Sequence, residues 1–335
     1  MKSNKKKLIA ALFVVTVCII VVIAVVSTIM SQMKKPGRDK NKIGIDTETE
    51  QEEIIVYDGV EYTPKTNIET YVFMGIDKDG MVEKATDYGE QGRCDVVMVL
   101  VRDMSQGTYK TLTIDRCTVM EQDSLDLDGS YLATSSCVLA LAHENGDGLE
   151  SSAENVVKAV SNFLGGQEVD GYAALNMGAV TVLNHAVGGV TVTIEDDLTA
   201  IDATLKQGET IHLNDEQAFH FVRARMGVEG ADTNQDRMRR QSVYMKGLKE
   251  QLRAVCAEDE KKPLEIYNGL EDYMVTNVGA NKFTKIAYLM AQDKDEGSVS
   301  IEGTTREGDM GFTEFMPDED SVQKAIIELF YTELK

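Results

Sequence analysis

The residues best suited to do chemistry are arginines that gather in one short segment of the chain. Five of them fall within 18 positions and make up half of the ten arginines beyond residue 42: Arg223, Arg225, Arg237, Arg239 and Arg240. A guanidinium presents a planar fork of N–H donors that matches the oxygens of a phosphate group. The segment therefore predicts a site that grips a phosphate or a pyrophosphate.

The alternative is a solvated helix surface on which the arginines pair with neighbouring acids, namely Glu229, Asp232 and Asp236. Two features favour anion binding over that alternative. Arginine rather than lysine stands at all five positions, and Arg223 and Arg225 come at the end of a largely apolar helical stretch. We keep both interpretations at this stage.

Helical spacing divides the second half of this segment into two faces. Arg237, Arg240, Gln241 and Tyr244 recur at i, i+3, i+4 and i+7, which places them on one side of a helix. Arg239 points away from that side, so we expect it to be an ordinary surface residue. Arg237, Arg240 and Gln241 are therefore candidate ligands of the pyrophosphate.

Two carboxylates are predicted to lie near one end of a sheet. Residues 69–77 have the pattern of a strand that ends in Asp77, and Asp95 directly precedes the apolar run VVMVLV. If the chain turns near residues 105–106, the numbers of facing residues in this hairpin sum to about 211. Asp95 then faces Arg116 at the end of the strands, where α/β sheets bind ligands.

Asp77 and Asp95 are candidate ligands for Mg²⁺, which prefers one or two carboxylates together with phosphate oxygens and water. The alternative is a pair of ordinary polar residues at strand ends. The same register places Cys94 opposite Cys117, which leaves open either a disulfide or two free thiols.

Several further elements are expected around these residues. The pattern predicts a helix over residues 135–143, a β-α-β unit over residues 172–194, and a helix over residues 215–225 that Asn214 caps. A long amphipathic helix follows to about residue 255, and further helices are expected near Ile266, Ile286 and Ile326.

The charge balance excludes one class of function. The chain has a net charge of -22, and residues 43–335 alone carry 25 basic and 55 acidic residues. Nucleic-acid binding rests on neutralising many phosphates with basic side chains. We therefore expect no nucleic-acid partner, whereas divalent cations are attracted.

The N-terminal residues have the pattern of a membrane anchor. Residues 8–30 carry no charged side chain, and lysines and an arginine flank them on both sides. As a helix, about 23 residues span roughly 35 Å, which is enough to cross a bilayer. Because no cleavage site is convincing, we expect a retained anchor with a short cytoplasmic N-terminus and the rest of the chain outside.

Seven segments, in this order, resemble the LytR-CpsA-Psr family. They are VFMGID (72–77), GRCDVVMVLV (92–101), TIDR (113–116), AENVVKAV (153–160), NHAVGGVTVTIEDD (184–197), FVRAR (221–225) and TNQDRMRRQ (233–241). The resemblance covers roughly residues 68–255. It implies a three-layer α-β-α domain with a central mixed sheet and an apolar pocket for a prenyl tail.

The resemblance also implies an activity. Family members transfer a glycopolymer, such as wall teichoic acid or capsule, from a polyprenyl pyrophosphate carrier to peptidoglycan. Asp77 and Asp95 then hold Mg²⁺, and the pyrophosphate lies among Arg93, Arg116, Arg223, Arg225, Arg237 and Gln241. Of these, Arg116, Arg223, Arg225 and Arg237 are the expected catalytic residues. Members were long named transcriptional attenuators, which the acidic composition and the anchor argue against here.

The resemblance gives a domain plan as well. It comprises a cytoplasmic tail (1–7), a transmembrane anchor (8–30), a linker (31–53), an extracellular catalytic domain (54–257) and a C-terminal helical extension (258–335) that either packs on the domain or forms an appended lobe.

Two positions depart from the family pattern. Cys117 stands where an aspartate usually follows the arginine that matches Arg116, and Asn234 stands three residues before Arg237, where an aspartate is common. Asn234 cannot act as a base. The sequence thus leaves open a second function, in which an envelope protein binds polyprenyl-linked glycans, or regulates envelope synthesis, without catalysis.

Overall fold

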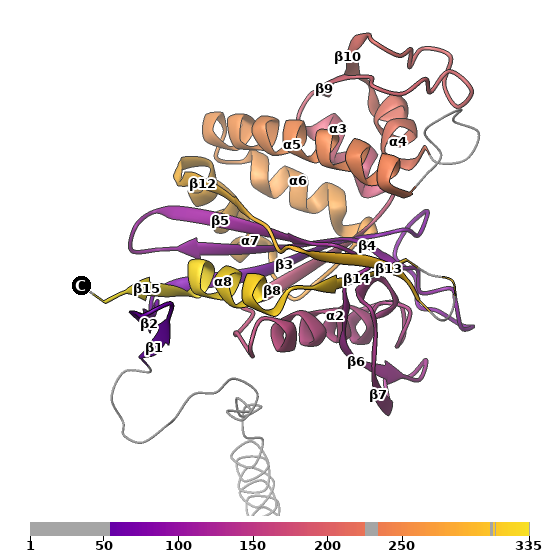
Figure 1. The fold of residues 1–335 in the computed structure, drawn as a ribbon. Helices are drawn as coiled ribbons and strands as arrows, with labels where there is room; N and C mark the ends of the chain where they lie inside the picture. The colour runs from indigo at the N-terminus through magenta and orange to yellow at the C-terminus, as the bar shows by residue number, and fades with distance from the viewer. Residues whose placement is uncertain (1–53, 225–233, 309–310, 312, 335) are drawn as a thin grey trace, which may run out of the picture. The chain divides into compact units, whose positions relative to one another are not determined.

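The computed structural model describes residues 54–224, 234–308, 311 and 313–334. Within them, strands and helices alternate around a central mixed sheet, so the predicted α/β class is confirmed (Figure 1). The described residues all belong to one compact unit. Among the described residues no helix is both long and apolar enough to cross a membrane. The predicted anchor at 8–30 lies outside them.

The central sheet has the strand order β11-β8-β3-β4-β5-β12. Its strands are β3 (Ile68–Ile76), β4 (Cys94–Asp103), β5 (Thr108–Ile114), β8 (Gly171–Asn176), β11 (Met274–Thr276) and β12 (Lys294–Val299). β8 runs parallel to β3, and β12 runs parallel to β5, whereas β3, β4 and β5 form an antiparallel meander and β11 is antiparallel to β8. The sheet is therefore mixed, as predicted.

The register of the β4–β5 hairpin agrees with the sequence prediction. Val97 pairs with Ile114, and Asp103 pairs with Thr108, so the facing numbers sum to 211. The turn closes through the bond that the Gly107 N–H donates to the Asp103 carbonyl. This register brings the residues before β4 and after β5 to the same end of the sheet.

Helices cover both faces of the sheet because side chains alternate along the strands. Val72 and Met74 of β3 contribute to a core that α2 (Glu150–Phe163) and α8 (Glu319–Phe330) cover. Tyr71, on the other face, belongs to a cluster with Ile286 of α7 (Ala280–Gln292). Figure 1 shows α6 (Lys262–Leu270) and α5 (Asn234–Glu258) on the opposite side of the sheet from α2.

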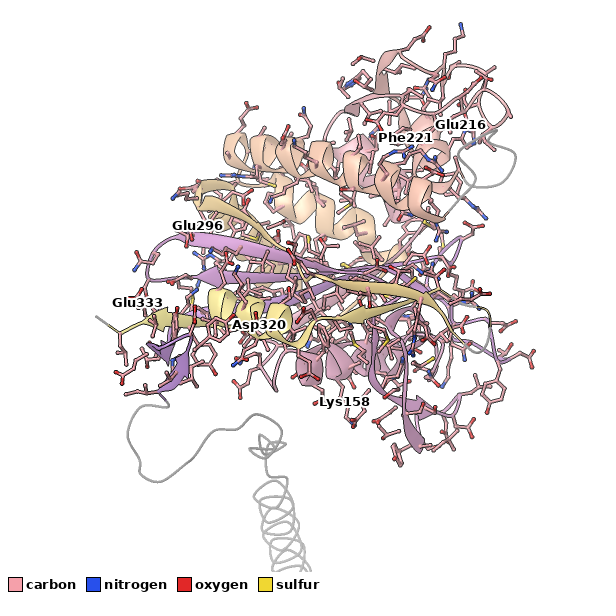
Figure 2. All side chains as sticks on the ribbon, viewed as in Figure 1. Lys158, Glu216, Phe221, Glu296, Asp320 and Glu333 are labelled. Atoms are coloured by element: carbon pink, nitrogen blue, oxygen red, sulfur yellow. The ribbon has the colours of Figure 1, made fainter. Side chains whose placement is uncertain are left out.

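A second apolar core lies beside the sheet, in a part of the molecule that we call the α4–α5 lobe. It contains α3 (Ala179–Ala186), β9 (Val190–Thr193), β10 (Thr210–Leu213), α4 (Asp215–Arg223) and the first half of α5. Asn214 caps α4, as predicted, because its side chain accepts the Gln217 N–H at 2.9 Å. Figure 2 shows Phe221, a buried residue of this core, in α4.

The predicted β-α-β unit over residues 172–194 is wrong, because β8 and β9 belong to different sheets. β9 pairs antiparallel with β10 alone. Gly188 and Gly189 both have positive φ and turn the chain away from the central sheet. A Cβ at Gly189 would also come within 2.5 Å of the His212 ring, so the chain passes too close to β10 for any other residue.

The predicted helix over residues 135–143 is also wrong. The chain instead forms a hairpin of β6 (Val119–Leu125) and β7 (Tyr131–Val138), followed by a single 3₁₀ turn over Leu139–Leu141. Tyr131, Thr134 and Val138 favour a strand when a partner is present, and β6 supplies that partner. The pairing of β7 with β6 therefore outweighs the local helix propensity of these residues.

The C-terminal residues complete the core, and they also form smaller sheets. Residues 258–335 supply both edge strands of the central sheet and helix α8. A 3₁₀ turn (Glu271–Tyr273) precedes β11. β13 (Gly303–Glu307) and β14 (Thr313–Pro317) form a hairpin, and β15 (Tyr331–Glu333) pairs with β2 (Val60–Pro64), which in turn pairs with β1 (Ile55–Tyr57).

Candidate functional site

A β-bulge places Asp95 at the end of the central sheet. Gly75 pairs with Val96 and Ile76 pairs with Cys94, so Asp95 is the extra residue in β4. A bulge bends its strand and redirects a side chain, and bulges are frequent beside active sites. Gly75 permits the close approach, because a Cβ there would lie 3.2 Å from the Val96 Cβ. The Asp95 side chain is buried.

Asp95 is held by two arginines that come from distant parts of the chain. Its Oδ2 pairs with Nη2 of Arg237 at 2.6 Å, and its Oδ1 pairs with Nη1 of Arg116. The side chains of Asp95, Arg237 and Arg116 are 6%, 10% and 14% exposed. We call these three residues the Asp95 cluster. The predicted Asp95–Arg116 pair is thereby confirmed.

Asp77 and Arg93 form the adjacent wall of the site. The Asp77 N–H donates to the Arg93 carbonyl at 2.9 Å, and the Arg93 N–H donates to the Asp77 Oδ1 at 2.6 Å. Gly92 must remain glycine for this contact, because its φ is +78° and a Cβ would lie 2.9 Å from Ile76. Asp77 itself is exposed, so its second oxygen is accessible.

Two residues of the segment after β7, Glu144 and His143, make hydrogen bonds to Arg93 and Gly92. Glu144 accepts a hydrogen bond from the Arg93 Nε at 2.8 Å. The Nδ1 of His143 lies 3.0 Å from the Gly92 carbonyl, and since that oxygen can only accept, the nitrogen carries the proton. Burial lowers the pKa of His143, so the ring is neutral near pH 7.

Arg116 and Arg237 bring two positive charges close together around Asp95. Burial lowers the pKa of Arg116, and the charge of Arg237 lowers it further, while Asp77 acts in the opposite direction. Two guanidiniums at one sheet end are a donor set that suits the oxygens of a phosphate group.

The remaining predicted arginines lie in different surroundings. Arg223 is half exposed, pairs with Asp79 at 2.5 Å and lies over the Phe219 ring. Arg225 lies outside the described residues. Arg239 pairs with Glu195, Asp196 and Asp236, in agreement with its predicted surface role.

The predicted shared face of α5 is confirmed, and the structure adds that this face is buried, although its members have different partners. Arg237, Arg240, Gln241 and Tyr244 are all buried. Whereas Arg237 reaches Asp95, both terminal nitrogens of Arg240 are engaged by protein groups: Nη1 by Asp196 at 2.6 Å and Nη2 by the Ala224 carbonyl. The sequence predicts Arg240 as a ligand of the pyrophosphate, whereas in the structure its two terminal nitrogens donate to acceptors of the protein itself.

Comparison with known proteins shows which family has this fold. The LytR_cpsA_psr family profile matches residues 24–329. The chain belongs to the LytR-CpsA-Psr family. No curated protein matches the sequence.

Solved structures share the fold of this LytR-CpsA-Psr protein. Bacillus subtilis TagV is 22% identical with a TM-score of 0.58, and the match covers 78% of this chain and 96% of TagV. A structure described as TagT bound to LI-WTA is 18% identical with a TM-score of 0.57, covering 80% of this chain and 92% of TagT. Bacillus subtilis yvhJ, described as a transcriptional regulator, is 19% identical with a TM-score of 0.53, covering 78% and 95%.

The donor set is suited to a hard cation with few protein ligands. Within the described residues, no three side chains of His, Cys, Asp or Glu converge as a metal cage. Asp77 and Asp95 lie on adjoining strand ends and supply carboxylate oxygens only. Mg²⁺ is typically held by one or two carboxylates and completes its shell with phosphate and water oxygens. The two residues therefore fit Mg²⁺, provided that Asp95 shares its oxygens with the arginines.

Of the two departures from the family pattern, the structure characterises the environment of Cys117. Burial raises the pKa of the Cys117 thiol, and the Asp115 carboxylate raises it further, so the thiol is protonated at neutral pH. The cysteines of the described residues form no disulfide, which excludes the Cys94–Cys117 bridge. Asn234 is the first residue of α5.

Sequence reasoning missed three residues that shape the site: Asp196, His143 and Glu144. Asp196 lies in the IEDD segment after β9, and a run of three consecutive acids on an acidic chain carries no special signal. His143 is the last residue of the stretch where a helix was expected, and Glu144 follows it directly. Their partners Gly92 and Arg93 are some fifty positions away, so only the folded chain brings them together.

Proposed function

We propose that the protein is a membrane-anchored phosphotransferase of cell-wall assembly. It transfers a glycopolymer of the wall teichoic acid or capsule type from a polyprenyl pyrophosphate carrier to peptidoglycan. Family membership and the fold shared with TagT and TagV support a role as a cell-wall glycopolymer transferase. Residues 8–30 anchor it, with the N-terminus in the cytoplasm and the folded residues outside the cell.

The observation that carries this proposal is the Asp95 cluster. Two buried guanidiniums share one carboxylate at the end of the central sheet, and Arg93 and Asp77 lie beside them. Preorganised positive charge of this kind stabilises a phosphoryl group during transfer mainly by electrostatics and positioning.

Each residue contributes a definite interaction. Arg116 and Arg237 pair with the pyrophosphate oxygens and stabilise the charge that develops on the leaving phosphate, and Arg93 and Gln241 border the same space. Arg223 lies at the end of α4, and Arg225 is the further guanidinium that the sequence predicts for the pyrophosphate. Asp77 and Asp95 would hold Mg²⁺, which would supply further positive charge to the pyrophosphate.

The reaction is a substitution at phosphorus. A hydroxyl oxygen of the acceptor sugar forms a bond to the sugar-linked phosphorus, and the bond from that phosphorus to the polyprenyl phosphate breaks. The hydroxyl proton leaves to a base, and polyprenyl monophosphate is the second product.

One observation favours a second candidate, a non-catalytic protein that binds polyprenyl pyrophosphate. Cys117 is a protonated thiol and Asn234 is an amide, at positions where the family commonly has carboxylates. If those carboxylates are needed for turnover, this chain binds the lipid-linked glycan without cleaving it.

The test uses the full-length protein in detergent micelles with a polyprenyl pyrophosphate-linked disaccharide and an oligosaccharide acceptor. We expect Mg²⁺-dependent release of polyprenyl monophosphate. Arg237→Met keeps the volume but removes the charge, and it lowers turnover by about 10²- to 10³-fold. If the lipid binds tightly but no polyprenyl monophosphate is released at any Mg²⁺ concentration, the proposed transferase activity is contradicted and the second candidate is supported.

A matched control removes a cation elsewhere. Lys294 is exposed at the beginning of β12, which pairs with Thr108 at the far end of β5 from the site. Its ion-pair partner Glu296 is labelled in Figure 2. Lys294→Met leaves turnover within about 2-fold of wild type, because an exposed ion pair contributes little.

A further inference from the structure

Arg240 occupies the contact between two helices that carry the predicted arginines. It lies in α5 and is only 3% exposed. Its Nη2 donates to the carbonyl of Ala224, at the C-terminal end of α4, and its Nη1 donates to the Asp196 Oδ2 at 2.6 Å. A planar guanidinium holds two acceptors at a fixed angle, which a lysine ammonium does not do.

The carbonyl that Arg240 holds is in a sensitive position. Ala224 is the residue between Arg223 and Arg225, and its own ψ of 126° turns the chain out of the helix. A guanidinium on the Ala224 carbonyl therefore fixes the end of α4, directly after Arg223.

The same side chain also fixes the position of α5. Arg237 lies three residues before Arg240, on the same face of the helix, and reaches the Asp95 Oδ2 at 2.6 Å. Each residue of an α-helix advances 1.5 Å along its axis and 100° around it. A small slide or rotation of α5 would consequently remove the Arg237 guanidinium from the Asp95 cluster.

Asp196 makes this arrangement electrostatically possible. Its two oxygens pair separately with Arg240 and with Arg239, and Asp196 itself is 9% exposed. A buried guanidinium without a counter-charge is costly, and Asp196 supplies that counter-charge to Arg240 inside the lobe.

We propose that Asp196 and Arg240 are positioning residues that hold the end of α4 against α5 and thereby keep Arg237 in the Asp95 cluster, where it meets the pyrophosphate. This role rests on the proposed function, since it presumes a pyrophosphate at the Asp95 cluster. Neither residue touches the ligand; each acts through the backbone and the helix that it holds.

The test measures binding of inorganic pyrophosphate with Mg²⁺ by calorimetry, together with turnover, on the full-length protein in detergent. Arg240→Lys and Asp196→Asn each weaken pyrophosphate binding by about 10-fold and lower turnover by up to about 10²-fold, because small misplacements at a reacting centre are expensive. The double variant is no worse than either single variant, since both break one linkage.

A direct ligand behaves differently, and Asp196→Asn makes the distinction. If Arg240 contacts pyrophosphate itself, Asp196→Asn releases it and binding stays equal or becomes tighter, which overturns the positioning role. Arg239→Lys is the matched control. Arg239 shares Asp196 but its side chain is 44% exposed, so we expect binding within about 2-fold of wild type.

Two further outcomes separate the two proposals. If the wild type does not bind pyrophosphate, the proposed function fails and the positioning role falls with it. If the wild type binds and the variants bind equally well, only the positioning role is overturned. Where Asp196→Asn does not fold, Asp196→Glu keeps the charge with a longer side chain, and the same loss of affinity is expected from it.

Discussion

Two parts of the molecule contain the same three charged groups, one aspartate between two arginines. In the Asp95 cluster, Asp95 pairs with Arg116 and Arg237. In the α4–α5 lobe, Asp196 pairs with Arg239 and Arg240. Both aspartates are buried, and both use each of their oxygens. Composition alone does not tell the two apart.

The origin of the partners distinguishes them. The residues of the Asp95 cluster come from β4, from the chain after β5 and from α5, and they meet at the end of the sheet beside the exposed Asp77. The arginines of Asp196 are consecutive residues of one helix, and Arg240 is spent on a backbone carbonyl. Three separate elements bring Asp95, Arg116 and Arg237 together at an open end of the sheet, which suits a binding site. Asp196 instead receives two neighbouring arginines of one helix, which suits a structural contact that holds the helix in place.

The largest expected difference between the two aspartates is in their response to Mg²⁺. Asp95→Asn removes a proposed ligand, so we expect turnover to fall by about 10²-fold or more and half-saturation to need far more Mg²⁺. Asp196→Asn leaves the Mg²⁺ concentration at half-saturation unchanged. Titrations of turnover against Mg²⁺ for both variants check this.

Stability provides the control for that comparison. Each substitution leaves a buried arginine without its carboxylate, at a cost of about 3–5 kcal/mol in the free energy of unfolding. Denaturant unfolding measures it. Equal losses of stability with unequal Mg²⁺ responses support the distinction, and an identical shift in half-saturation for both variants contradicts it.

A smaller effect concerns pH. The folded-state pKa of His143 is lowered by burial, so its contribution to stability is fully present above the unfolded value of about 6.5 and is lost as pH falls toward the folded value. Between pH 7.5 and 5.5 the free energy of unfolding falls by at most about 1.4 kcal/mol per pH unit from this group. Urea unfolding at several pH values measures the slope.

His143→Asn tests this cause, because the asparagine amide can replace the Nδ1–H donor to Gly92 but does not titrate. We expect a shallower slope than in the wild type. The exposed His185 gives the matched control, His185→Asn. If His185→Asn reduces the slope of the free energy of unfolding against pH and His143→Asn does not, the pH response arises outside the site.

The smallest effect is expected at Cys117, next to Arg116. Its thiol is protonated at neutral pH because burial and Asp115 raise its pKa, and thiolate is the reactive form. Cys117→Ser therefore changes turnover by less than about 2-fold and stability by less than about 1 kcal/mol. Kinetics of this variant check it, and a tenfold loss shows that the sulfur takes part.

The sequence predicted those features that local patterns determine. The turn between β4 and β5 sets their register, so Asp95 and Arg116 were placed correctly. Helical spacing put Arg237 and Arg240 on one buried face of α5. The motif order identified the family.

Features that depend on long-range pairing were not accessible. The strand that carries Val190 to Thr193 was assigned to a β-α-β unit, because the pattern of a strand does not reveal its sheet. Arg240 was predicted as a ligand because its spacing matches Arg237. The partner that engages it, Asp196, is 44 positions away.

The placement of the last strands has a consequence for synthesis. Both edges of the central sheet, β11 and β12, and the strand β15 that pairs with β2 come from the final quarter of the chain. A chain emerges N-terminus first, so β3, β4 and β5 wait for residues 274–333 before the sheet is closed. The central sheet that positions the site is therefore completed only after the arginine segment has been translated.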